Sequence, residues 1–408
     1  MSETTFAVEF VGCKVSMVDA HEIRERLAAD GHVEAEPGRA RVRVVNTCCV
    51  TAEAVAKSRK AVRRAARDAD RVFVTGCAAN LGGDTFADTG ANVTVIGRRS
   101  EETPAAISDR LGGLGCAGGM PAFARTRAYV KIQDGCSFAC SYCVIPSVRG
   151  ASRSRRAADV LRDAARRAAR GHRELVLTGV NLGCFRDRQA GLDLAELLRA
   201  VAAVDGVERV RLSSIEVNHL TDRLLRAVAE TPAVAPHLHV PMQSGSDEVL
   251  RAMRRHYTAA GFLAKLFRAR ELIPGLNLTS DVIVGHPAED AAAFDRTLAA
   301  VREAGFSKVH VFPYSPRPGT ADEAADPVPA AEKRRRSAAL RRLSDEQGRR
   351  HRAAKLGSAE LVLVEGDDGR GYSADYTPFR VPGGRPGELA PAVARELEGG
   401  LVVATMRR

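Results

Sequence analysis

The sequence predicts an α/β protein with three parts: an N-terminal parallel α/β domain, a partial (β/α)6 barrel and a small C-terminal β-barrel. Apolar strands alternate with helical stretches through the first two parts, and this alternation is typical of parallel sheets. The C-terminal part instead has short apolar runs separated by glycine-containing turns, which favour a small, OB-like β-barrel. A length of 408 residues agrees with two or three domains.

The N-terminal domain is expected to span residues 1–111. Its candidate strands are Phe6–Val11, Val42–Thr47 and Arg71–Gly76, with helical stretches at Asp19–Ala28 and Ala52–Ala66. Residues 112–124 begin with the run GGLGCAGGM, and such a glycine-rich segment is typical of a linker.

The middle domain is expected to span residues 125–355 and to end in a basic helical stretch, Lys333–Lys355. Its candidate strands are AYVKIQ (128–133), Glu174–Gly179, Arg209–Ser214, His237–Met242, Leu278–Gly285 and Lys308–Pro313. Helical runs separate them, such as Ala157–Arg170, for which Gly171 is the expected C-cap. Six strand–helix units are too few for a closed eight-fold barrel, so we expect an open one. Residues 358–408 form the predicted small β-barrel.

Charge and composition limit the possible partners and the compartment. The formal net charge is +11, which favours a polyanion such as nucleic acid, although solvated helix faces would also account for it. The sequence has neither a secretory leader pattern nor an apolar run long enough to span a bilayer, so we expect a cytoplasmic protein without membrane contact. In that reducing compartment, nine cysteines indicate metal binding or redox chemistry more than disulfides.

Three cysteines lie close together in QDGCSFACSYCVIPSVRG, just after the first strand of the middle domain. They are Cys136, Cys140 and Cys143, spaced CxxxCxxC. Structural zinc usually takes four ligands in two pairs, and no second pair follows nearby. Thiolates also bind iron–sulfur clusters. Three thiolates on a four-iron cluster would leave one iron open to a substrate or cofactor.

This loop resembles the signature of the radical S-adenosylmethionine (SAM) superfamily. The resemblance implies a [4Fe-4S] cluster on these catalytic cysteines, with SAM bound to the open iron and cleaved to a 5′-deoxyadenosyl radical. It also implies SAM contacts at strand ends, where barrel ligands bind. The implied cofactor-binding residues are Thr178, Gly179, Asn181, Ser214, Glu216, Gln243, Ile283 and Gly285.

Three further cysteines each follow one predicted strand of the N-terminal domain. They are Cys13, Cys48 and Cys77. Residues just past neighbouring parallel strands meet at one sheet edge, so these thiols are expected to converge and could hold a second cluster. Three small buried thiols are the alternative. Cys49, Cys116 and Cys184 are expected to have no such role, and strand alternation would point Cys49 away from the site.

The segments VGCKVS, NTCCVTAEAVAKSRKA and VTGCA resemble the cysteine motifs of the methylthiotransferase family. The resemblance covers nearly the whole chain and implies a cluster domain, a radical SAM barrel and a C-terminal TRAM domain that binds RNA. It implies two [4Fe-4S] clusters, SAM, and an electron donor such as a flavodoxin or ferredoxin. FPYSPRPGT and TGVNLGC resemble the branch that places a methylthio group on carbon 2 of N6-threonylcarbamoyladenosine in tRNA.

A tRNA substrate requires cations for its phosphates and aromatic rings for its bases. The candidates are Arg149, Arg153, Arg155, Arg156, the basic stretch from Lys333, Tyr372, Tyr376 and Phe379. Two alternatives remain open. The same chemistry could act on isopentenyladenosine in tRNA or on a ribosomal-protein aspartate, or the chain could be a metal-stabilised RNA-binding protein without catalysis.

Overall fold

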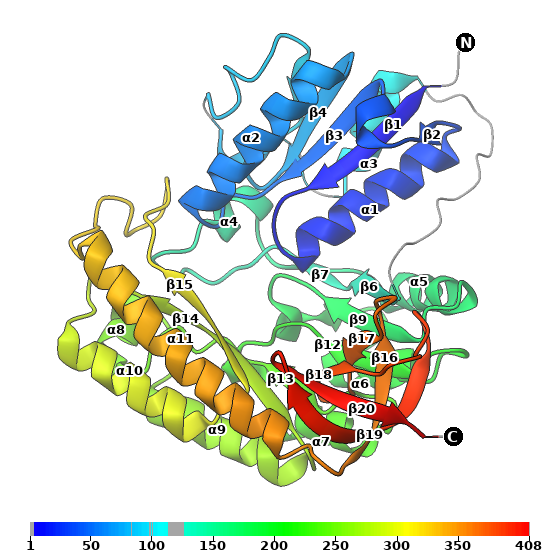
Figure 1. Cartoon of the computed structure of the whole chain (residues 1–408). Helices are drawn as coiled ribbons and strands as arrows, with labels where there is room; N and C mark the ends of the chain where they lie inside the picture. The colour runs from blue at the N-terminus through cyan, green and yellow to red at the C-terminus, as the bar shows by residue number, and fades with distance from the viewer. Residues whose placement is uncertain (1–3, 83, 98, 100, 113–125, 408) are drawn as a thin grey trace. The chain divides into compact units, whose positions relative to one another are not determined.

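The structure is a computed structural model that describes residues 4–82, 84–97, 99, 101–112 and 126–407 (Figure 1). The chain forms two compact units. The first combines the N-terminal sheet with Asp134–Ser152 and Ser315–Ala325, and the second contains the remaining barrel and the C-terminal segment. The three-cysteine loop therefore groups with the N-terminal sheet, whereas the sequence analysis assigns it to the middle domain. Apart from Gly112, the predicted linker lies outside the described residues, as does Cys116.

Within the described part of the first unit, five parallel strands form one sheet in the order β2-β1-β3-β4-β5. The strands are β1 (Thr5–Phe10), β2 (Val33–Glu34), β3 (Val42–Thr47), β4 (Arg71–Gly76) and β5 (Val93–Val95). The helices are α1 (Lys14–Ala29), α2 (Ala52–Asp68), α3 (Thr103–Leu111) and α4 (Ile145–Arg149). Helices α1 and α3 pack on one face and α2 on the other, each through its own apolar core (Figure 1).

The described part of the second unit contains six parallel strands in chain order, which confirms the partial barrel. They are β6 (Arg127–Lys131), β9 (Glu174–Thr178), β12 (Arg209–Leu212), β13 (His237–His239), β14 (Asn277–Val284) and β15 (Lys308–Pro313). Three strands pair on each side, and a bridge between Ser214 and His239 joins the two sheets. The covering helices are α5 (Ala157–Ala169), α6 (Leu194–Ala202), α7 (Asp222–Glu230), α8 (Asp247–Ala252), α9 (Ala259–Leu272), α10 (Ala291–Ala304) and α11 (Ala330–Ala353).

The predicted small β-barrel is present and closed, in the strand order β16-β17-β18-β20-β19. Its strands are β16 (Ala359–Val364), β17 (Arg370–Tyr372), β18 (Pro378–Arg380), β19 (Leu389–Glu398) and β20 (Leu401–Met406). Inward-facing valines and alanines fill it together with Phe379, which is fully buried. Phe379 therefore cannot stack on an RNA base, and that prediction is wrong.

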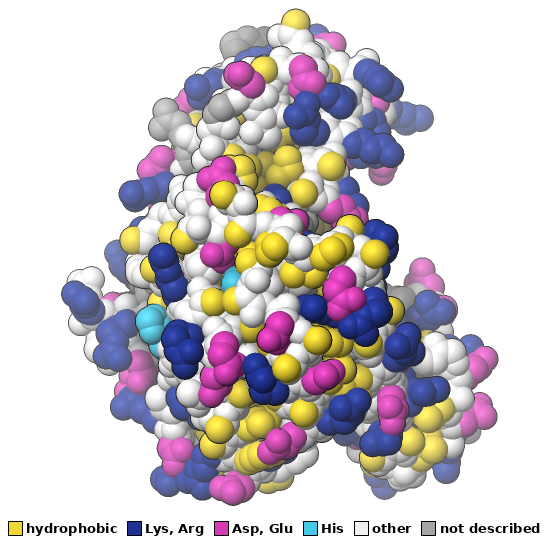
Figure 2. Space-filling view, turned by 90° about the vertical axis from the view of Figure 1, so that its left-hand side faces the viewer, with side chains coloured by type: hydrophobic (Ala, Val, Ile, Leu, Met, Phe, Trp, Pro, Cys, Tyr) yellow, Lys and Arg dark blue, Asp and Glu magenta, His cyan; other side chains and the backbone are white. Residues whose placement is uncertain are grey.

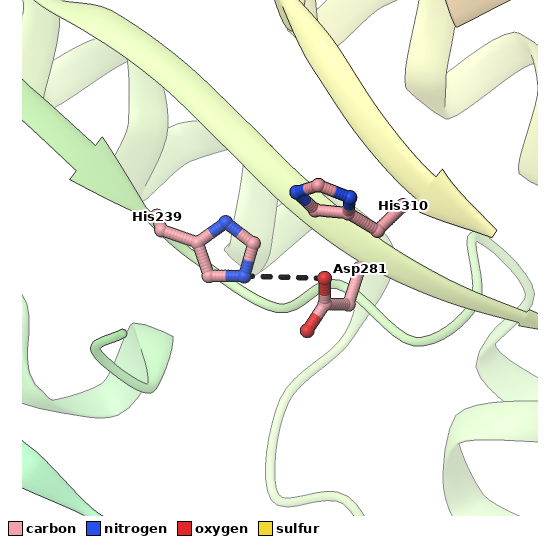
Figure 3. A group of neighbouring side chains, drawn as sticks. All are labelled: His239, Asp281 and His310. Carbon is pink, nitrogen blue, oxygen red and sulfur yellow. Dashed lines mark ion pairs between the residues drawn. The ribbon is translucent and has the colours of Figure 1, made fainter. Parts of the chain in front are cut away.

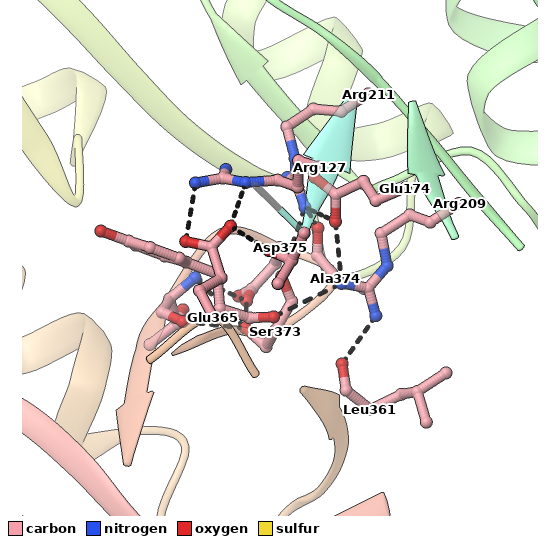
Figure 4. A network of polar contacts seen from close by, with 12 residues as sticks. Arg127, Glu174, Arg209, Arg211, Leu361, Glu365, Ser373, Ala374 and Asp375 are labelled. Carbon is pink, nitrogen blue, oxygen red and sulfur yellow. Dashed lines mark hydrogen bonds and ion pairs between the residues drawn. The ribbon is translucent and has the colours of Figure 1, made fainter. Parts of the chain in front are cut away.

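The small barrel docks on the amino-terminal ends of the large-barrel strands, through the polar network in Figure 4. Arg209 donates to the main-chain oxygen of Leu361 at 2.7 Å, and Arg211 donates to that of Ala374 at 2.9 Å. Glu174 lies between the two arginines, 3.2 Å from Arg209 and 2.8 Å from Arg211, and is fully buried. Buried guanidinium groups thus have both a counter-charge and hydrogen-bond acceptors, as buried charges require.

Glu174 stabilises this junction as a carboxylate. Burial alone would raise its pKa, but the charge of Arg211, its hydrogen bond and the charge of Arg209 hold the pKa of Glu174 below its ordinary value. The stability that the Glu174 carboxylate contributes is therefore complete above the pKa of Glu174 in the unfolded chain. It is lost as the pH falls through the pKa of Glu174 in the folded chain.

We expect Glu174→Gln to destabilise the chain by about 3 kcal/mol or more, because it leaves two buried guanidinium groups without a counter-charge. The measurement is the urea midpoint for unfolding of the large barrel. Glu230→Gln is the matched control, since Glu230 pairs with Arg199 on the surface and should contribute less than about 1 kcal/mol. Equal midpoints for the two variants would show that the network does not stabilise the junction.

Candidate functional site

Three sequence-predicted cysteines meet at the carboxyl edge of the N-terminal sheet. Cys13, Cys48 and Cys77 follow β1, β3 and β4, which are neighbours in that sheet. Cys48 and Cys77 are buried and Cys13 is exposed. The three thiols are near enough that Cys13 and Cys77 both act electrostatically on Cys48. The parallel topology therefore gathers residues that lie far apart in the sequence.

Gly12 allows the loop after β1 to approach Cys48. Its φ is +136°, and a Cβ there would lie 2.9 Å from the Cβ of Cys48 and 3.2 Å from its sulfur. Any other residue would collide with the thiol at a backbone angle that L-residues rarely adopt. Burial raises the pKa of Cys48 to about 11. Its thiol is therefore protonated at neutral pH, and binding of a metal cluster would displace that proton.

Cys49 lies on the same side as Cys77, contrary to expectation. Its thiol is fully buried and belongs to the same apolar core as Cys77. Strand alternation fails here because β3 ends at Thr47, so Cys48 and Cys49 lie in the loop beyond it.

Arg149 is a second neighbour of Cys77. Its Nε donates to the Cys77 sulfur at 3.1 Å, and its two terminal nitrogens bind Asp19 and Asp134 at 2.8 Å and 3.0 Å. The sequence analysis predicts Arg149 as a surface contact for RNA. That prediction is wrong, because buried carboxylates and a thiol already surround its guanidinium.

The loop with Cys136, Cys140 and Cys143 is closed at its base by main-chain contacts. The amide of Cys136 donates to the oxygen of Gly150 at 3.0 Å, and a Cβ on Gly135 would lie only 2.2 Å from the oxygen of Ala151. All three thiols are partly exposed. Inside the loop, the amide of Phe138 donates to the Cys136 sulfur at 3.4 Å.

This geometry fits an iron–sulfur cluster. The donor set consists of thiolate-forming residues, which are the ligands that iron–sulfur clusters take. The amide of Phe138 already points at a ligand sulfur, as outer-shell donors do around bound metals. The group of Cys13, Cys48 and Cys77 has the same donor chemistry, with Arg149 as a donor to the Cys77 sulfur.

The residues expected to bind SAM lie at the carboxyl ends of the large-barrel strands. Thr178 ends β9 and Ser214 follows β12, while Gln243, Ile283 and Gly285 lie around the ends of β13 and β14. The loop after β9 is fixed by Gln133, whose Oε1 accepts from the amide of Asn181 at 2.7 Å. A Cβ on Gly179 would lie 2.9 Å from the main-chain oxygen of Gln133. The structure thus brings most of this set to one edge.

Gln243 and Glu216 differ in how they are held. Gln243 has a φ of +65°, an unusual backbone for a residue other than glycine, and such strain is concentrated at functional sites. Its amide donates to the oxygen of Asp281 at 2.9 Å, which keeps the loop in place. Glu216 forms an ion pair with Arg255 at 3.2 Å and accepts from the amide of Asn218. These two contacts hold the Glu216 side chain in the fold.

The sequence analysis missed a polar group on β13, β14 and β15: His239, Asp281 and His310 (Figure 3). His239 Nε2 lies 3.2 Å from an Asp281 oxygen, and its Nδ1 lies 2.9 Å from the Thr279 hydroxyl. The possible ligand atoms of His239, Asp281 and His310 lie within 4.8 Å of one another. Imidazole nitrogens and carboxylate oxygens are ligands that divalent transition metals accept. The contact with His239 already gives Asp281 a polar partner without a metal. His239 lies between the core residues Leu238 and Val240, and this alternation could have indicated the polar face.

Comparison with known proteins gives matches over most of the chain. The Radical SAM superfamily model matches residues 130–301, and the model described as Uncharacterized protein family UPF0004 matches residues 5–97. A Thermotoga maritima protein named threonylcarbamoyladenosine tRNA methylthiotransferase MtaB is 34% identical, over 94% of this chain and 93% of its own length. A Streptomyces coelicolor tRNA-2-methylthio-N(6)-dimethylallyladenosine synthase is 33% identical over 93% of this chain and 81% of its own.

The chain belongs to the radical SAM methylthiotransferase family. It is therefore an enzyme of that type, as the sequence analysis predicts. The nature of the family also supports SAM and an iron–sulfur cluster as cofactors of this methylthiotransferase.

Solved structures agree on the fold. The radical SAM methyltransferase TsrM from Kitasatospora setae, with cobalamin and a [4Fe-4S] cluster bound, superposes with a TM-score of 0.58 at 15% identity. The match covers 79% of this chain and 77% of that one. At this identity the likeness concerns the fold alone. No helix in the described part of this methylthiotransferase is long and apolar enough to cross a membrane.

The residues predicted to contact RNA are distributed unevenly. Arg156 is exposed and pairs with Asp159. Arg155 is half-buried, donates to the main-chain oxygen of Lys131 and pairs with Asp163. Arg153 is also partly buried. Tyr372 and Tyr376 stack on each other at the junction of the two barrels, with ring centroids 4.6 Å apart. On the face in Figure 2, Lys and Arg side chains lie among Asp and Glu side chains and form no single patch.

The two tyrosines already have a structural role in this methylthiotransferase. The Arg127 guanidinium lies 5.1 Å from the ring of Tyr372 and 5.3 Å from that of Tyr376, within the range of cation–π attraction. Arg211 lies 4.7 Å from the Tyr376 ring. These contacts hold the rings against the large barrel, and both tyrosines are only partly exposed.

Proposed function

We propose that this methylthiotransferase inserts a methylthio group at carbon 2 of N6-threonylcarbamoyladenosine at position 37 of tRNA, next to the anticodon. The observation that supports it most is the presence of two groups of three cysteines in one compact unit, each with the donor chemistry of an iron–sulfur site. A binding protein without catalysis would need neither a partly exposed three-thiol loop nor a second group of thiols.

The two cysteine groups are assigned different roles. Cys136, Cys140 and Cys143 would hold the cluster that binds SAM, and Cys13, Cys48 and Cys77 would hold an auxiliary [4Fe-4S] cluster. When bound, these groups supply the radical chemistry and the sulfur. The residues that would orient SAM at the carboxyl edge of the strands are Thr178, Gly179, Asn181, Ser214, Glu216, Gln243, Ile283 and Gly285. A flavodoxin or ferredoxin would supply electrons in the cytoplasm, where tRNA is modified.

The choice of nucleoside rests on the relatives. Proteins named for threonylcarbamoyladenosine are 32–37% identical to this chain, from Thermotoga maritima, Bacillus subtilis and Chlamydia pneumoniae. Proteins named for dimethylallyladenosine are 33–35% identical, which makes N6-dimethylallyladenosine the second candidate. Both classes of relative act on tRNA by name, so tRNA is the proposed substrate in either case.

Helix α11 offers a surface for tRNA phosphates. Two cations of the basic stretch are buried: Lys333 donates to the oxygen of Tyr314 at 3.1 Å, and Arg336 to that of Glu289 at 2.8 Å. The exposed cations of this helix are Arg334, Arg335, Arg341, Arg342, Arg349 and Arg350. Exposed arginines can neutralise phosphates, whereas the buried pair fixes the helix to the barrel.

The test is mass spectrometry of tRNA nucleosides from cells that lack this gene. We expect 2-methylthio-N6-threonylcarbamoyladenosine to disappear and the unmodified nucleoside to accumulate. The wild-type chain should restore the product and the Cys143→Ala chain should not. Loss of 2-methylthio-N6-dimethylallyladenosine instead would select the second candidate. Unchanged levels of both nucleosides would rule out a tRNA methylthiotransferase with these substrates.

A further inference from the structure

Arg149 connects the base of the three-cysteine loop to a cysteine of the other group. Asp134 precedes Cys136 by two residues and Arg149 follows Cys143 by six, and their ion pair of 3.0 Å closes the loop. The same guanidinium reaches Asp19 on α1 at 2.8 Å and the Cys77 sulfur at 3.1 Å. All these groups belong to the first compact unit. Because the guanidinium is planar, its three nitrogens fix the direction of every contact at once.

Cys49 is a second neighbour of Cys77. The Cys49 thiol is fully buried, and its side chain belongs to the same apolar core as that of Cys77. The Cys77 sulfur thus has one charged N–H donor, in Arg149, and a neutral thiol within the same core, in Cys49.

We propose that Arg149 and Cys49 are positioning residues that set the reduction potential of the auxiliary cluster through hydrogen bonds to Cys77. The proposal rests on the auxiliary cluster of the proposed function. It gives a role to Cys49, which a three-ligand site leaves unused, and to Arg149, which lies outside both groups of cysteines. Neither residue would touch the substrate or the reacting atoms.

The direction of the effect follows from charge. Adding an electron to a cluster makes its ligand sulfurs more negative, and hydrogen bonds to those sulfurs stabilise the reduced form. Removing a donor from Cys77 should therefore move the potential to a more negative value. Arg149 should have the larger effect, because charge-assisted hydrogen bonds are about twice as strong as neutral ones. Its loss would also leave Asp19 and Asp134 facing the cluster without a counter-charge.

The experiment is a redox titration of the auxiliary cluster, followed by electron paramagnetic resonance in anaerobically reconstituted full-length protein. Cys136→Ala/Cys140→Ala/Cys143→Ala is the parent, so that only the auxiliary cluster contributes to the signal. We expect Cys49→Ala to shift the potential to a more negative value and Arg149→Lys to shift it further. Lysine keeps the charge but lacks the planar fork that reaches Cys77, Asp19 and Asp134 together.

Two matched controls separate hydrogen bonding from general disturbance. Cys49→Ser keeps a hydroxyl donor at the same place and should restore a potential near that of the parent. Cys184→Ala removes a partly exposed thiol in the other unit and should leave the potential unchanged. Should Arg149→Lys fail to fold, the comparison of Cys49→Ala with Cys49→Ser still decides the matter.

The outcomes distinguish this inference from the proposed function. If the parent assembles no cluster, the auxiliary cluster itself is wrong and the inference falls with it. If the parent assembles a cluster but the potentials of Cys49→Ala and Cys49→Ser coincide, the inference is overturned and the proposed function stands.

Discussion

Cys143→Ala is expected to reduce cleavage of SAM to 5′-deoxyadenosine to the level seen without protein. The three thiols of the loop are the proposed ligands of the cluster that binds SAM, and a cluster held by two thiolates would be lost or would no longer bind SAM. The sulfur of Cys143 is partly exposed and its amide donates to the oxygen of Cys140 at 3.2 Å, so alanine leaves the main chain of the loop intact. The measurement is 5′-deoxyadenosine formed by anaerobically reconstituted enzyme with dithionite.

Cys184→Ala is the matched control for this variant. Cys184 is also a partly exposed thiol in a loop after a strand, where it contacts His219 Nε2 at 3.5 Å. Its removal should leave SAM cleavage within about twofold of the wild type, as surface substitutions usually do. Full cleavage activity in Cys143→Ala would exclude this loop as the site where SAM is activated.

Cys48→Ala is expected to retain SAM cleavage and to lose methylthio transfer to tRNA. Cys48 belongs to the other cysteine group, at the end of β3, and the three-cysteine loop keeps its own contacts without it. The proposed auxiliary cluster would lose one of three protein ligands, and with it the source of the sulfur. Two products measured in the same reaction, 5′-deoxyadenosine and methylthiolated nucleoside, give the answer.

The interpretation of Cys48→Ala depends on its folding. Removing one buried sulfur should cost about 1 kcal/mol, which the unfolding midpoint can verify. Thr51→Ala serves as a comparison of similar cost nearby, because Thr51 caps α2 by accepting from the amide of Ala54. That variant should keep both products. Methylthiolated nucleoside from Cys48→Ala would refute the sulfur-donor role.

Elements with a clear period could be predicted from the sequence to the residue. The strands Val42–Thr47, Arg71–Gly76 and Lys308–Pro313 agree at both ends, and α2 begins at Ala52 as expected. Thr51 provides the side-chain cap there, a signal that a sequence shows directly. Helix α1 begins five residues before its predicted start, because its N-cap is Cys13, whose side chain makes no capping bond. Strands β2 and β5 have two and three residues, which is too short for a strand pattern to show in the sequence.

The sequence predicts those features of the candidate site that follow from the order of the strands. It does not predict those that depend on contacts between particular side chains. Parallel strands bring Cys13, Cys48 and Cys77 to one edge whatever surrounds them. The burial of Arg149 depends on Asp19 and Asp134, which lie 130 and 15 residues away in the chain, and the sequence does not reveal that pairing. The contact between Cys49 and Cys77 likewise arises in loops beyond the strands, where alternation no longer applies.

The arginines beneath the large barrel bind peptide oxygens of the small barrel, those of Leu361, Ser373 and Ala374. Every residue type offers the same carbonyl, so these particular bonds survive almost any substitution at the three positions that keeps the backbone path. The side chains of the small barrel can therefore change while the hydrogen bonds that join it to the large barrel stay the same.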